Sequence, residues 1–417
     1  MMSSLYLDSK KKKNKTSARQ TAIPNRAKKS NATEYYNFAT MELNDDLVVE
    51  IISYLPLKLA VQCKVLSKNF NTRISDLKFS QIWFPHQKIS STLFVYHSYG
   101  PNRVHKISIN PPFPTTHSEM FLLPDHSSVL ASCRGLLLLV FLKFRNFCVF
   151  NPITGAHQLI SYPKPIHEFM KFRGIGLAVD YPTSDQYKLV IVGKLAEQQG
   201  YKFYVFSSER SGLWHEVRFR VNFINLAQCT KPVYVNDSLH WLRSDGSVLA
   251  FNTKREEAII LDLPAFFSHH APIYGKLYPG FDTWLGMAQG LLTLVCKFRK
   301  STVIAAYDYV TSNWRVSHTL DNFMGIPVWI DSKHVLFLEG SYTKQHRYLY
   351  VYDSENNGYK LADILNQNYI INNDMCSFQP TLASVQTTRL DTLSDEHLPV
   401  ITATLDELRQ FITIDNQ

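Results

Sequence analysis

Two patterns of hydrophobic positions divide this chain of 417 residues. Between residues 43 and 84, apolar residues recur with the period of an α-helix. From about residue 91 to residue 386, short apolar stretches alternate with polar turn residues, which is typical of β-strands joined by hairpins. The patterns therefore predict a small helical unit followed by a larger domain that is mainly β.

The helical stretch opens with LNDDLVVEIISYLPLK at residues 43–58. Its apolar residues fall on one face of a helix: Leu47, Val48, Ile51, Ile52 and Leu55. Asn44 is a candidate N-cap, and the two aspartates after it suit the positive end of the helix dipole. Pro56 is expected to end the helix, because the residue before a proline avoids the helical conformation.

Two more helices are expected before residue 84. A short one runs through Val61 and Val65, and another begins near Ser67 and carries Phe70 and Ile74. A unit of about forty residues buries little surface by itself, so its remaining apolar face needs a covering surface. That surface is either the domain that follows or a partner.

The β region contains six recurring units. Each places a bulky apolar anchor residue before a polar turn, and the anchors are Ile109, Phe150, Phe206, Phe251, Tyr307 and Tyr352. The Asn, Asp or Ser after an anchor is expected to bond the backbone and hold the turn. The anchors lie 41, 56, 45, 56 and 45 residues apart, which is typical of propeller blades. We predict a six-bladed β-propeller over residues 91–386; a β-sandwich or two stacked β domains would not explain the repeat.

A further strand precedes most of the units, but the first unit lacks one. A matching apolar stretch, FQPTLASV, follows the sixth unit at residues 378–385. We expect this stretch to return to the first unit and complete the first blade. Such a closure would pair the two ends of the ring and remove free sheet edges.

The composition suits a chain with a sizeable core, since 45% of its residues are hydrophobic and 13% are aromatic. No apolar run approaches the roughly 18 residues that a membrane helix needs. The longest run, Leu136–Leu142, suits a buried strand. The six cysteines are scattered singly, so the sequence indicates neither a zinc site nor a redox motif. The expected state is free thiols in a reducing compartment.

The net charge of +9 is concentrated at the N-terminus. Residues 1–40 hold nine basic and two acidic residues (+7), which leaves 35 basic and 33 acidic residues (+2) for the other 377. A nearly neutral body argues against a nucleic-acid-binding fold. The tail, residues 1–40, is expected to be disordered. Its clusters Lys10–Lys13 and Arg26–Lys29 are either a nuclear-import signal or part of an ordinary solvated tail.

Motifs of catalysis and cofactor binding are missing from the sequence. It contains no GxGxxG entering a helix, no phosphate-binding GxxxxGK[ST] loop, no HExxH and no GxSxG. His269 and His270 are adjacent and are expected at the surface rather than on a metal. Asp245 and Asp262 lie near turns without a pattern that would pair them as acid and base. Four tryptophans of the repeats are expected to pack between blades rather than bind a ligand: Trp214, Trp241, Trp314 and Trp329.

The segment LNDDLVVEIISYLPLKLAVQCKVLSKNFNTRISDLKF resembles an F-box. It matches the pattern of that family in order at Leu43, Asp46, Leu47, Glu50, Ile51, Leu55, Pro56, Lys58, Val65, Lys68, Ile74, Ser75, Asp76 and Phe79. It departs at Asn44, Leu66, Phe70 and Leu77, where the family has proline, cysteine, tryptophan and proline. The missing proline at Asn44 bears on how tightly a partner would be held.

The β region resembles the plant F-box-associated domain, a relative of the kelch propellers. SCRGLLLL, FCVFNPITG, GLAVDYPTSDQYKLV, FYVFSSERSGLWHEV and VYVNDSLHWL follow one another in the order of that family. The double glycines of true kelch repeats are missing, so the fold that the resemblance implies is a kelch-like six-bladed propeller preceded by a small three-helix F-box. The corresponding domains are a tail at 1–40, the F-box at 43–84, the propeller at 91–386 and a C-terminal tail at 387–417. That last tail contains LDELRQF, a candidate short helix without an assigned function.

The resemblance implies the substrate receptor of an SCF-type (Skp–cullin–F-box) ubiquitin ligase. The F-box would dock on a Skp-family adaptor, and through it on a cullin, while the propeller would bind an unidentified protein target for ubiquitination and degradation. The implied adaptor surface is Leu43, Leu47, Ile51, Leu55, Pro56 and Val65, whereas Phe70 and Ile74 would pack the helices together. The chain would hold no catalytic residue, metal or cofactor and would act by proximity. No nucleic acid or membrane is an expected partner, and the expected location is cytoplasmic and/or nuclear.

Two alternatives remain open at this point. Asn44 and the missing tryptophan at Phe70 would also fit an F-box protein that acts as a scaffold or decoy outside an active ligase. A propeller enzyme or small-molecule binder would need convergent carboxylates or histidines in a central pocket. The hairpin loops Lys194–Gly200 and Lys297–Thr302 are candidates for target binding, with ordinary solvated turns as the alternative.

Overall fold

The computed structural model describes the helical region and most of the β region. The described residues are 44–86, 91–96, 103–109, 115–123, 127–163, 174–195, 200–209, 213–227, 231–262, 283–321, 325–330, 334–339, 346–353, 358–366, 375–385 and 398–413. The predictions for the tail 1–40 and for His269 and His270 lie outside these residues.

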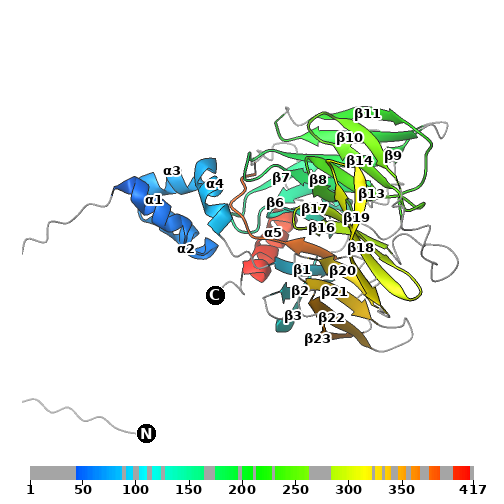
Figure 1. Ribbon diagram of the computed structural model, residues 1–417. Coiled ribbons are helices and arrows are strands. Elements are labelled where there is room, and N and C mark those ends of the chain that lie inside the picture. The colour runs from blue at the N-terminus through cyan, green and yellow to red at the C-terminus, as the bar shows by residue number, and fades with distance from the viewer. Residues whose placement is uncertain are drawn as a thin grey trace, which may run out of the picture. The chain divides into compact units, whose positions relative to one another are not determined.

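A helical unit begins the described chain, as Figure 1 shows in blue. Its elements are α1 Asp45–Ser53, α2 Leu57–Gln62, the 3₁₀ helix η1 Cys63–Val65, α3 Lys68–Ser75 and α4 Leu77–His86. The three predicted helices are present, but the number three is wrong because α4 follows as a separate helix. Asp76 takes an extended conformation (φ −72°, ψ 142°), and its carboxylate accepts a hydrogen bond from the Lys78 N–H at 2.8 Å. This cap ends α3 and starts α4.

The described strands of the β region form six four-stranded antiparallel sheets. Sheet 1 is the sheet that contains β1. Within each sheet, the first strand named is the one that contacts the first strand of the next sheet. Sheet 1 is β24 Met375–Phe378, β1 Ser91–Tyr96, β2 Arg103–Ile109 and β3 Thr115–Leu122; sheet 2 is β4 Ser127–Cys133, β5 Leu136–Phe141, β6 Asn146–Phe150 and β7 His157–Ser161; sheet 3 is β8 Ile175–Val179, β9 Tyr187–Lys194, β10 Gly200–Ser207 and β11 Trp214–Arg220. Sheet 4 is β12 Val233–Val235, β13 Ser238–Leu242, β14 Val248–Asn252 and β15 Glu257–Leu261; sheet 5 is β16 Thr283–Ala288, β17 Leu291–Lys297, β18 Ser301–Asp308 and β19 Asn313–Asp321; sheet 6 is β20 Ile326–Ile330, β21 His334–Glu339, β22 His346–Asp353 and β23 Gly358–Asn366.

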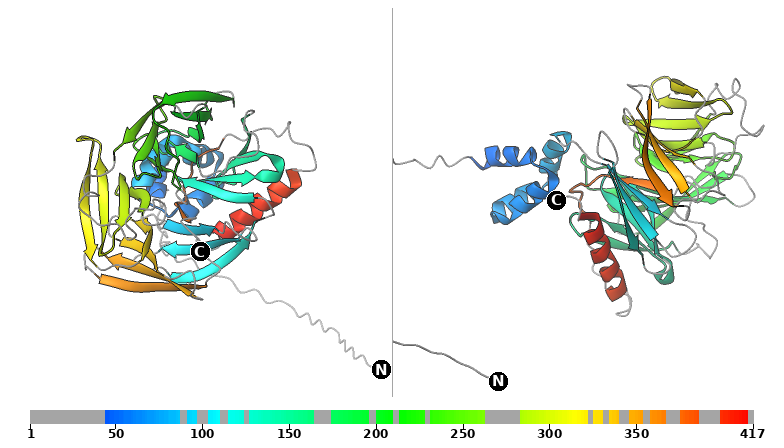
Figure 2. Two further views of the ribbon diagram at one scale, coloured as in Figure 1. Left: turned by 90° about the vertical axis from the view of Figure 1, so that its right-hand side faces the viewer. Right: turned by 90° about the horizontal axis from the view of Figure 1, so that it is seen from below.

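The sheets follow one another around a common centre, which Figure 2 shows on the left. The first strands of consecutive sheets are in contact from β24 through β4, β8, β12 and β16 to β20, and β23 of the last sheet contacts β3 of the first. This arrangement is that of a β-propeller. The protein is therefore mainly β, with a propeller preceded by a small helical region.

The predicted repeat is confirmed in its internal register. Every anchor residue lies at or next to the end of the third strand of its sheet, from Ile109 in β2 to Tyr352 in β22. The turn residues after the anchors act as expected. The Oδ1 atom of Asn151 accepts from the Ile153 N–H at 2.9 Å, that of Asn252 from the Arg255 N–H at 2.8 Å, and that of Asp308 from the Val310 N–H at 2.9 Å.

The ring is closed by a strand from the far end of the chain, as predicted, but not by the residues predicted for it. β24 pairs antiparallel with β1, with Phe378 opposite Thr92 and Met375 opposite Val95. Residues 379–385 are not part of any strand. Pro380 has no N–H to donate to a ladder, and the carbonyls beyond it accept hydrogen bonds from a side chain of sheet 2 instead. The closing strand therefore precedes most of the predicted range 378–385.

Large apolar side chains fill the space between neighbouring sheets. β5 is buried along its whole length, which confirms the buried strand predicted from the longest apolar run. Cys63, Cys133 and Cys148 are free cysteines, and burial raises the pKa of the Cys133 thiol to about 12. The described residues include no helix with the length and hydropathy of a membrane span.

Two of the four tryptophans join neighbouring sheets by a hydrogen bond as well as by packing. The Trp214 indole N–H donates to the Ser161 carbonyl at 2.8 Å, and the Trp314 indole N–H donates to the Asp262 carbonyl at 3.0 Å. Trp241 is buried against Phe203. Packing between blades is thus confirmed for these three, whereas the Trp329 side chain lies outside the described residues.

The C-terminal region contains a longer helix than the sequence predicted. α5 spans Leu398–Thr413 and includes the LDELRQF segment. Its buried face packs into the core shared by sheets 1 and 2, where the Phe411 ring stacks on Phe121 at 5.5 Å between centroids. Arg409 donates from Nη2 to the Ile153 carbonyl at 3.3 Å. α5 therefore covers the junction at which the ring closes.

Candidate functional site

Polar contacts between α1 and α3 stabilise the arrangement of the helices. The Asp46 carboxylate pairs with the Arg73 guanidinium, and the Asp45 carboxylate accepts from the Asn69 side-chain amide at 2.6 Å. Ser67 caps α3 by accepting the Phe70 N–H at 3.1 Å. These contacts fix the first turn of α1 against α3, so one face of α1 turns inward and the other remains outside.

The inward face forms a core that the helices share. Val49, Ile52, Ala60, Ile74, Phe79 and Trp83 are buried in it. The Trp83 indole N–H donates to the Leu55 carbonyl at 3.1 Å, which satisfies a carbonyl at the end of α1. Ile74 is buried and Phe70 packs against the same core, which confirms the packing role predicted for both residues. Phenylalanine therefore fills space at the position where the F-box pattern has tryptophan.

The outward face of α1 carries apolar side chains that the rest of the chain leaves exposed. Leu47 is 50% exposed and Ile51, one helical turn later, is 54% exposed. Val65 in η1 is 86% exposed, and Pro56 is also exposed. Leu55 differs, because it is half-buried against the shared core. Leu43 lies outside the described residues.

Three exposed apolar residues of the same region were not among the predicted ones: Tyr54, Leu59 and Leu66. Tyr54 lies seven residues after Leu47 and three after Ile51, so helical spacing alone assigns it to the outward face. The Tyr54 ring also lies 4.2 Å from the His86 ring, centroid to centroid. We refer to Leu47, Ile51, Tyr54, Leu59, Val65 and Leu66 together as the docking residues.

Charge around the docking residues is mixed. Asp45 and Asp46 lie in the first turn of α1, where carboxylates favour the positive end of the helix dipole. Burial lowers the pKa of the Lys64 ammonium beside Val65. An apolar surface of this kind, with charged groups at its margin, is typical of a protein-binding site.

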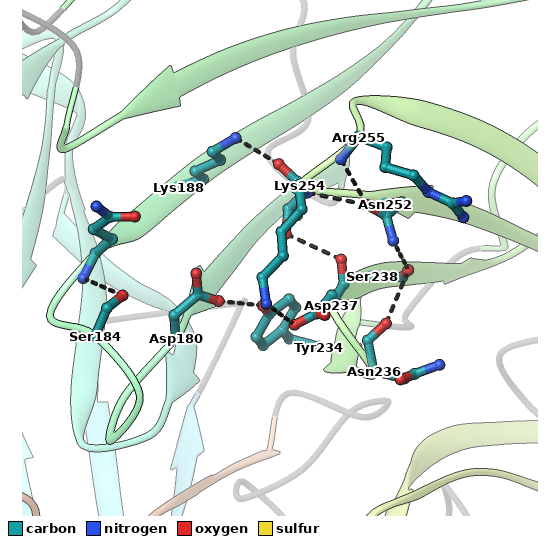
Figure 3. A network of polar contacts seen from close by, with 12 residues as sticks. Asp180, Ser184, Lys188, Tyr234, Asn236, Asp237, Ser238, Asn252, Lys254 and Arg255 are labelled. Atoms are coloured by element: carbon teal, nitrogen blue, oxygen red, sulfur yellow. Dashed lines mark hydrogen bonds and ion pairs between the residues drawn. The ribbon is translucent and has the colours of Figure 1, made fainter.

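A second cluster of polar side chains lies in the turns between sheets 3 and 4 (Figure 3). The Tyr234 hydroxyl donates to Asp180 Oδ1 at 2.6 Å, and Lys254 pairs with Asp237 at 2.9 Å. Lys188 contacts Glu256 at 3.2 Å. The Tyr234–Asp180 and Lys188–Glu256 contacts join the two sheets, and the Lys254–Asp237 pair joins two turns of sheet 4. The cluster therefore stabilises the contact between these sheets.

Glu256 is the acidic centre of this cluster. Its second oxygen lies 2.8 Å from His215 Nε2. Burial acts to raise the pKa of Glu256, but the hydrogen bonds and charges of His215 and Lys188 outweigh it and hold the pKa below its usual value. The carboxylate therefore stays ionised and links β9 and β11 of sheet 3 to the turn before β15.

The two carboxyl residues considered for acid–base chemistry do not form a pair. Asp245 accepts from the Ser247 hydroxyl at 2.7 Å within its own turn, and Asp262 contributes its backbone carbonyl to Trp314. Within the described stretches, no group of three or more His, Cys, Asp and Glu side chains is placed to hold a metal ion.

Of the two hairpin loops considered for target binding, Lys297–Thr302 is described throughout, whereas Lys194–Gly200 is described in part, because residues 196–199 lie outside the described set. Lys194 places its ammonium 5.2 Å from the centre of the Phe223 ring. In the other loop, the Phe298 N–H donates to the Ser301 carbonyl at 2.7 Å, which makes a tight turn. Target binding by either loop stays a prediction.

Comparison with known families gives two matches, which follow one another along the chain. Residues 41–81 match the F-box domain, and residues 88–274 match the F-box associated beta propeller domain. The first match falls on the helical unit and the second on the β-propeller. The chain is an F-box protein of the kind that carries an F-box-associated β-propeller domain.

Its curated relatives are F-box proteins of Arabidopsis thaliana. The putative F-box/kelch-repeat protein At1g20790 is 28% identical over 232 residues, which is 52% of this chain and 49% of that protein. The putative F-box protein At1g20795 is 26% identical over 221 residues, 49% of this chain and 51% of that protein. The chain thus spans about half the length of these relatives. Among solved structures, TolB from Acinetobacter baumannii covers 69% of this chain and 66% of its own, with a TM-score of 0.41 and 10% identity.

Proposed function

We propose that this protein is the substrate-recognition subunit of an SCF-type ubiquitin ligase. In this proposal the docking residues, together with Leu43, Leu55 and Pro56, bind a Skp-family adaptor that links the chain to a cullin. The propeller holds a target protein for ubiquitination and degradation. The F-box match and the Arabidopsis relatives support the proposal.

The observation that carries the proposal is the division of α1 into two apolar faces. Val49 and Ile52 are buried in the core of the helical unit, whereas Leu47 and Ile51 are half exposed. Fully burying an exposed leucine or isoleucine contributes roughly 1.5–3 kcal/mol, so covering the exposed half of Leu47 or Ile51 contributes roughly half of that. A helix that keeps a second apolar face in water is best explained by a partner that covers that face.

The proposal also concerns the shape of the propeller and its role in target binding. We propose that the six sheets act as the blades of one kelch-like ring, and that loops at one end of the ring bind the target. The chain itself performs no covalent step in this scheme. It raises the local concentration of the target at the enzyme that carries ubiquitin, so that a bimolecular transfer becomes nearly unimolecular. A cytoplasmic and/or nuclear location belongs to the same proposal.

A scaffold or decoy role outside an active ligase is a second candidate, and Asn44 is the observation that favours it. This residue stands where the F-box pattern has proline. A proline at this position would fix the backbone that precedes α1. Asparagine leaves this backbone less preorganised for binding an adaptor. An affinity for the adaptor far below that of an ordinary F-box would support the scaffold role.

The test is copurification of the full chain with a recombinant Skp-family adaptor. We expect Ile51→Asp, alone or with Pro56→Ala, to abolish copurification because it places a carboxylate in an apolar interface. The matched control is Ile259→Asp on β15, since Ile259 is 58% exposed and Ile51 is 54% exposed. Unchanged binding of the Ile51 variant would overturn the surface assignment. Loss of binding in both variants would point to a general effect of the added charge instead.

A further inference from the structure

The segment 379–385, which follows β24, contacts both the propeller and the helical unit. We call it the closing segment. Leu382 lies in the middle of it and is buried in the core of the helical unit, together with Val49, Ile52 and Ile74 of the helices. A residue that is more than 300 positions from α1 in sequence thus completes the core behind the docking residues.

The propeller holds the residues on either side of Leu382. The Asn151 side-chain amide donates to the Thr381 carbonyl at 3.2 Å and to the Ala383 carbonyl at 2.6 Å. The Thr381 hydroxyl donates to the Arg134 carbonyl at 2.9 Å. Ala383 and Val385 are buried in the core between sheets 2 and 3. With both neighbours fixed in this way, the backbone of Leu382 has little freedom to follow a movement of the helices.

A second contact joins α4 to the turn after β8. The Phe84 ring meets the Tyr181 ring edge-on, with 5.9 Å between the centroids. Tyr181 is fully buried, and the Arg134 guanidinium donates to its backbone carbonyl. Ile153, from the turn between β6 and β7, packs against the helical core as well. The helical unit therefore rests on turns of sheets 2 and 3 in addition to the closing segment.

The turn that carries Tyr181 is itself fixed to the next sheet. Asp180, its neighbour, accepts the Tyr234 hydroxyl from β12, as Figure 3 shows. Asp185, at the other end of the turn, accepts the Ser384 N–H of the closing segment at 3.2 Å. The polar cluster between sheets 3 and 4 thus holds in place the turn that contacts the helices.

We propose that the closing segment is a positioning element that fixes the F-box on the propeller. Leu382 acts through the helical core and holds the docking residues at one distance and orientation from the blades. The inference rests on the proposed function only in taking those residues as the adaptor site. Its value for transfer is geometric, because a target held at a fixed position meets the ubiquitin-carrying enzyme more often than one on a freely moving arm.

The test measures the distance between the two parts of the full chain by double electron–electron resonance. Spin labels are introduced as unnatural amino acids at the exposed positions Gln62 of α2 and Thr319 of β19. The labelled chain without further substitutions is expected to give a single narrow distance peak. Leu382→Ala combined with Phe84→Ala is expected to lose that peak and give a broad distribution. Leu382→Met, which conserves volume, and Ser384→Ala, an exposed neighbour, are expected to keep the peak.

A measurement of adaptor affinity distinguishes this inference from the proposed function and from misfolding. The double variant is expected to keep its adaptor affinity, because the helices retain the other buried residues of their core: Val49, Ile52, Ala60, Ile74, Phe79 and Trp83. A broad distribution in the parent chain would overturn the inference without any variant. A narrow peak retained by the double variant would overturn it as well, whatever the adaptor binding shows.

Discussion

The side-chain amide of Asn151 donates to the carbonyls of both Thr381 and Ala383, at 3.2 and 2.6 Å, across 230 and 232 positions of the sequence. The same side chain accepts from the Ile153 N–H at 2.9 Å and so holds the turn after β6. One asparagine therefore shapes a local turn and seats the segment that closes the ring. Neither carbonyl is exposed to water, since Thr381 and Ala383 are both fully buried.

The first prediction is that Asn151→Ala lowers the free energy of unfolding by about 2–4 kcal/mol, because two buried carbonyls lose their donor. Asn252→Ala is the matched control. Asn252 holds the equivalent turn of sheet 4 by accepting from the N–H groups of Lys254 and Arg255, and its amide donates to the Ser238 hydroxyl of the same sheet. We expect the control to cost about 1 kcal/mol. Urea unfolding followed by tryptophan fluorescence compares them, and an equal loss in both would contradict the role of Asn151 in closure.

The second prediction concerns two glycines with positive φ in equivalent hairpin turns. A Cβ at Gly135 (φ +82°) would lie 2.0 Å from the Thr381 hydroxyl oxygen of the closing segment, whereas a Cβ at Gly290 (φ +74°) meets nothing within 4 Å. Gly290→Ala should therefore cost only the backbone term of about 1–2 kcal/mol. Gly135→Ala should cost considerably more, because it also displaces Thr381.

Hydrogen exchange of β24 and α5 separates these two glycine variants further. Gly135→Ala is expected to speed exchange in both elements, since the closing segment connects them to the ring. Gly290→Ala should leave their exchange at the level of the parent chain. If the two variants exchange alike there, the contact between Gly135 and Thr381 is not part of ring closure.

The third prediction is a dependence of stability on pH that comes from His240. This histidine is fully buried in β13, with Nδ1 3.2 Å from the Val233 carbonyl and Nε2 3.1 Å from the Tyr309 hydroxyl. Burial lowers its pKa from 6.5 to about 4. Above pH 6.5 both the folded and the unfolded chain hold it neutral. Between that value and about 4, only the unfolded chain takes up a proton, so acid destabilises the fold by on the order of 3 kcal/mol.

Urea midpoints at about pH 7.5 and about pH 5 test this dependence. His240→Asn should reduce the difference between the two midpoints, although it lowers stability at both. His318→Asn is the control, because His318 is exposed on β19. A parent chain that is equally stable at both values, or a variant that keeps the whole difference, would contradict the assignment to His240.

The sequence was sufficient for the parts of the fold that depend on local pattern. The anchors end the third strands because an apolar strand followed by Asn, Asp or Ser is a local signal. Ring closure was also foreseen, but its strand was placed too late in the chain. Phe378 pairs in the ladder, but the apolar character of residues 379–385 reflects burial between sheets and helices. Periodicity does not distinguish these two kinds of burial.

The candidate site was predictable to a similar degree. Helical spacing identified an apolar face on α1, but it did not show which residues the fold would cover. Leu55 is half-buried because it packs against the core to which Trp83 belongs, and Tyr54 beside it remains outside. The entry of Leu382 into the same core had no local signal at all, since it depends on a contact between distant parts of the chain.

In the proposed function, the helical unit recruits a ligase while the propeller recruits a target. Affinity purification with mass spectrometry, performed on the parent chain and on Ile51→Asp while the proteasome is inhibited, tests both halves together. We expect the parent chain to copurify with an adaptor, a cullin and a set of target proteins. The variant is expected to copurify with the same targets but without adaptor and cullin. Recovery of adaptor and cullin with Ile51→Asp, or their absence from the parent chain, would contradict the proposed function.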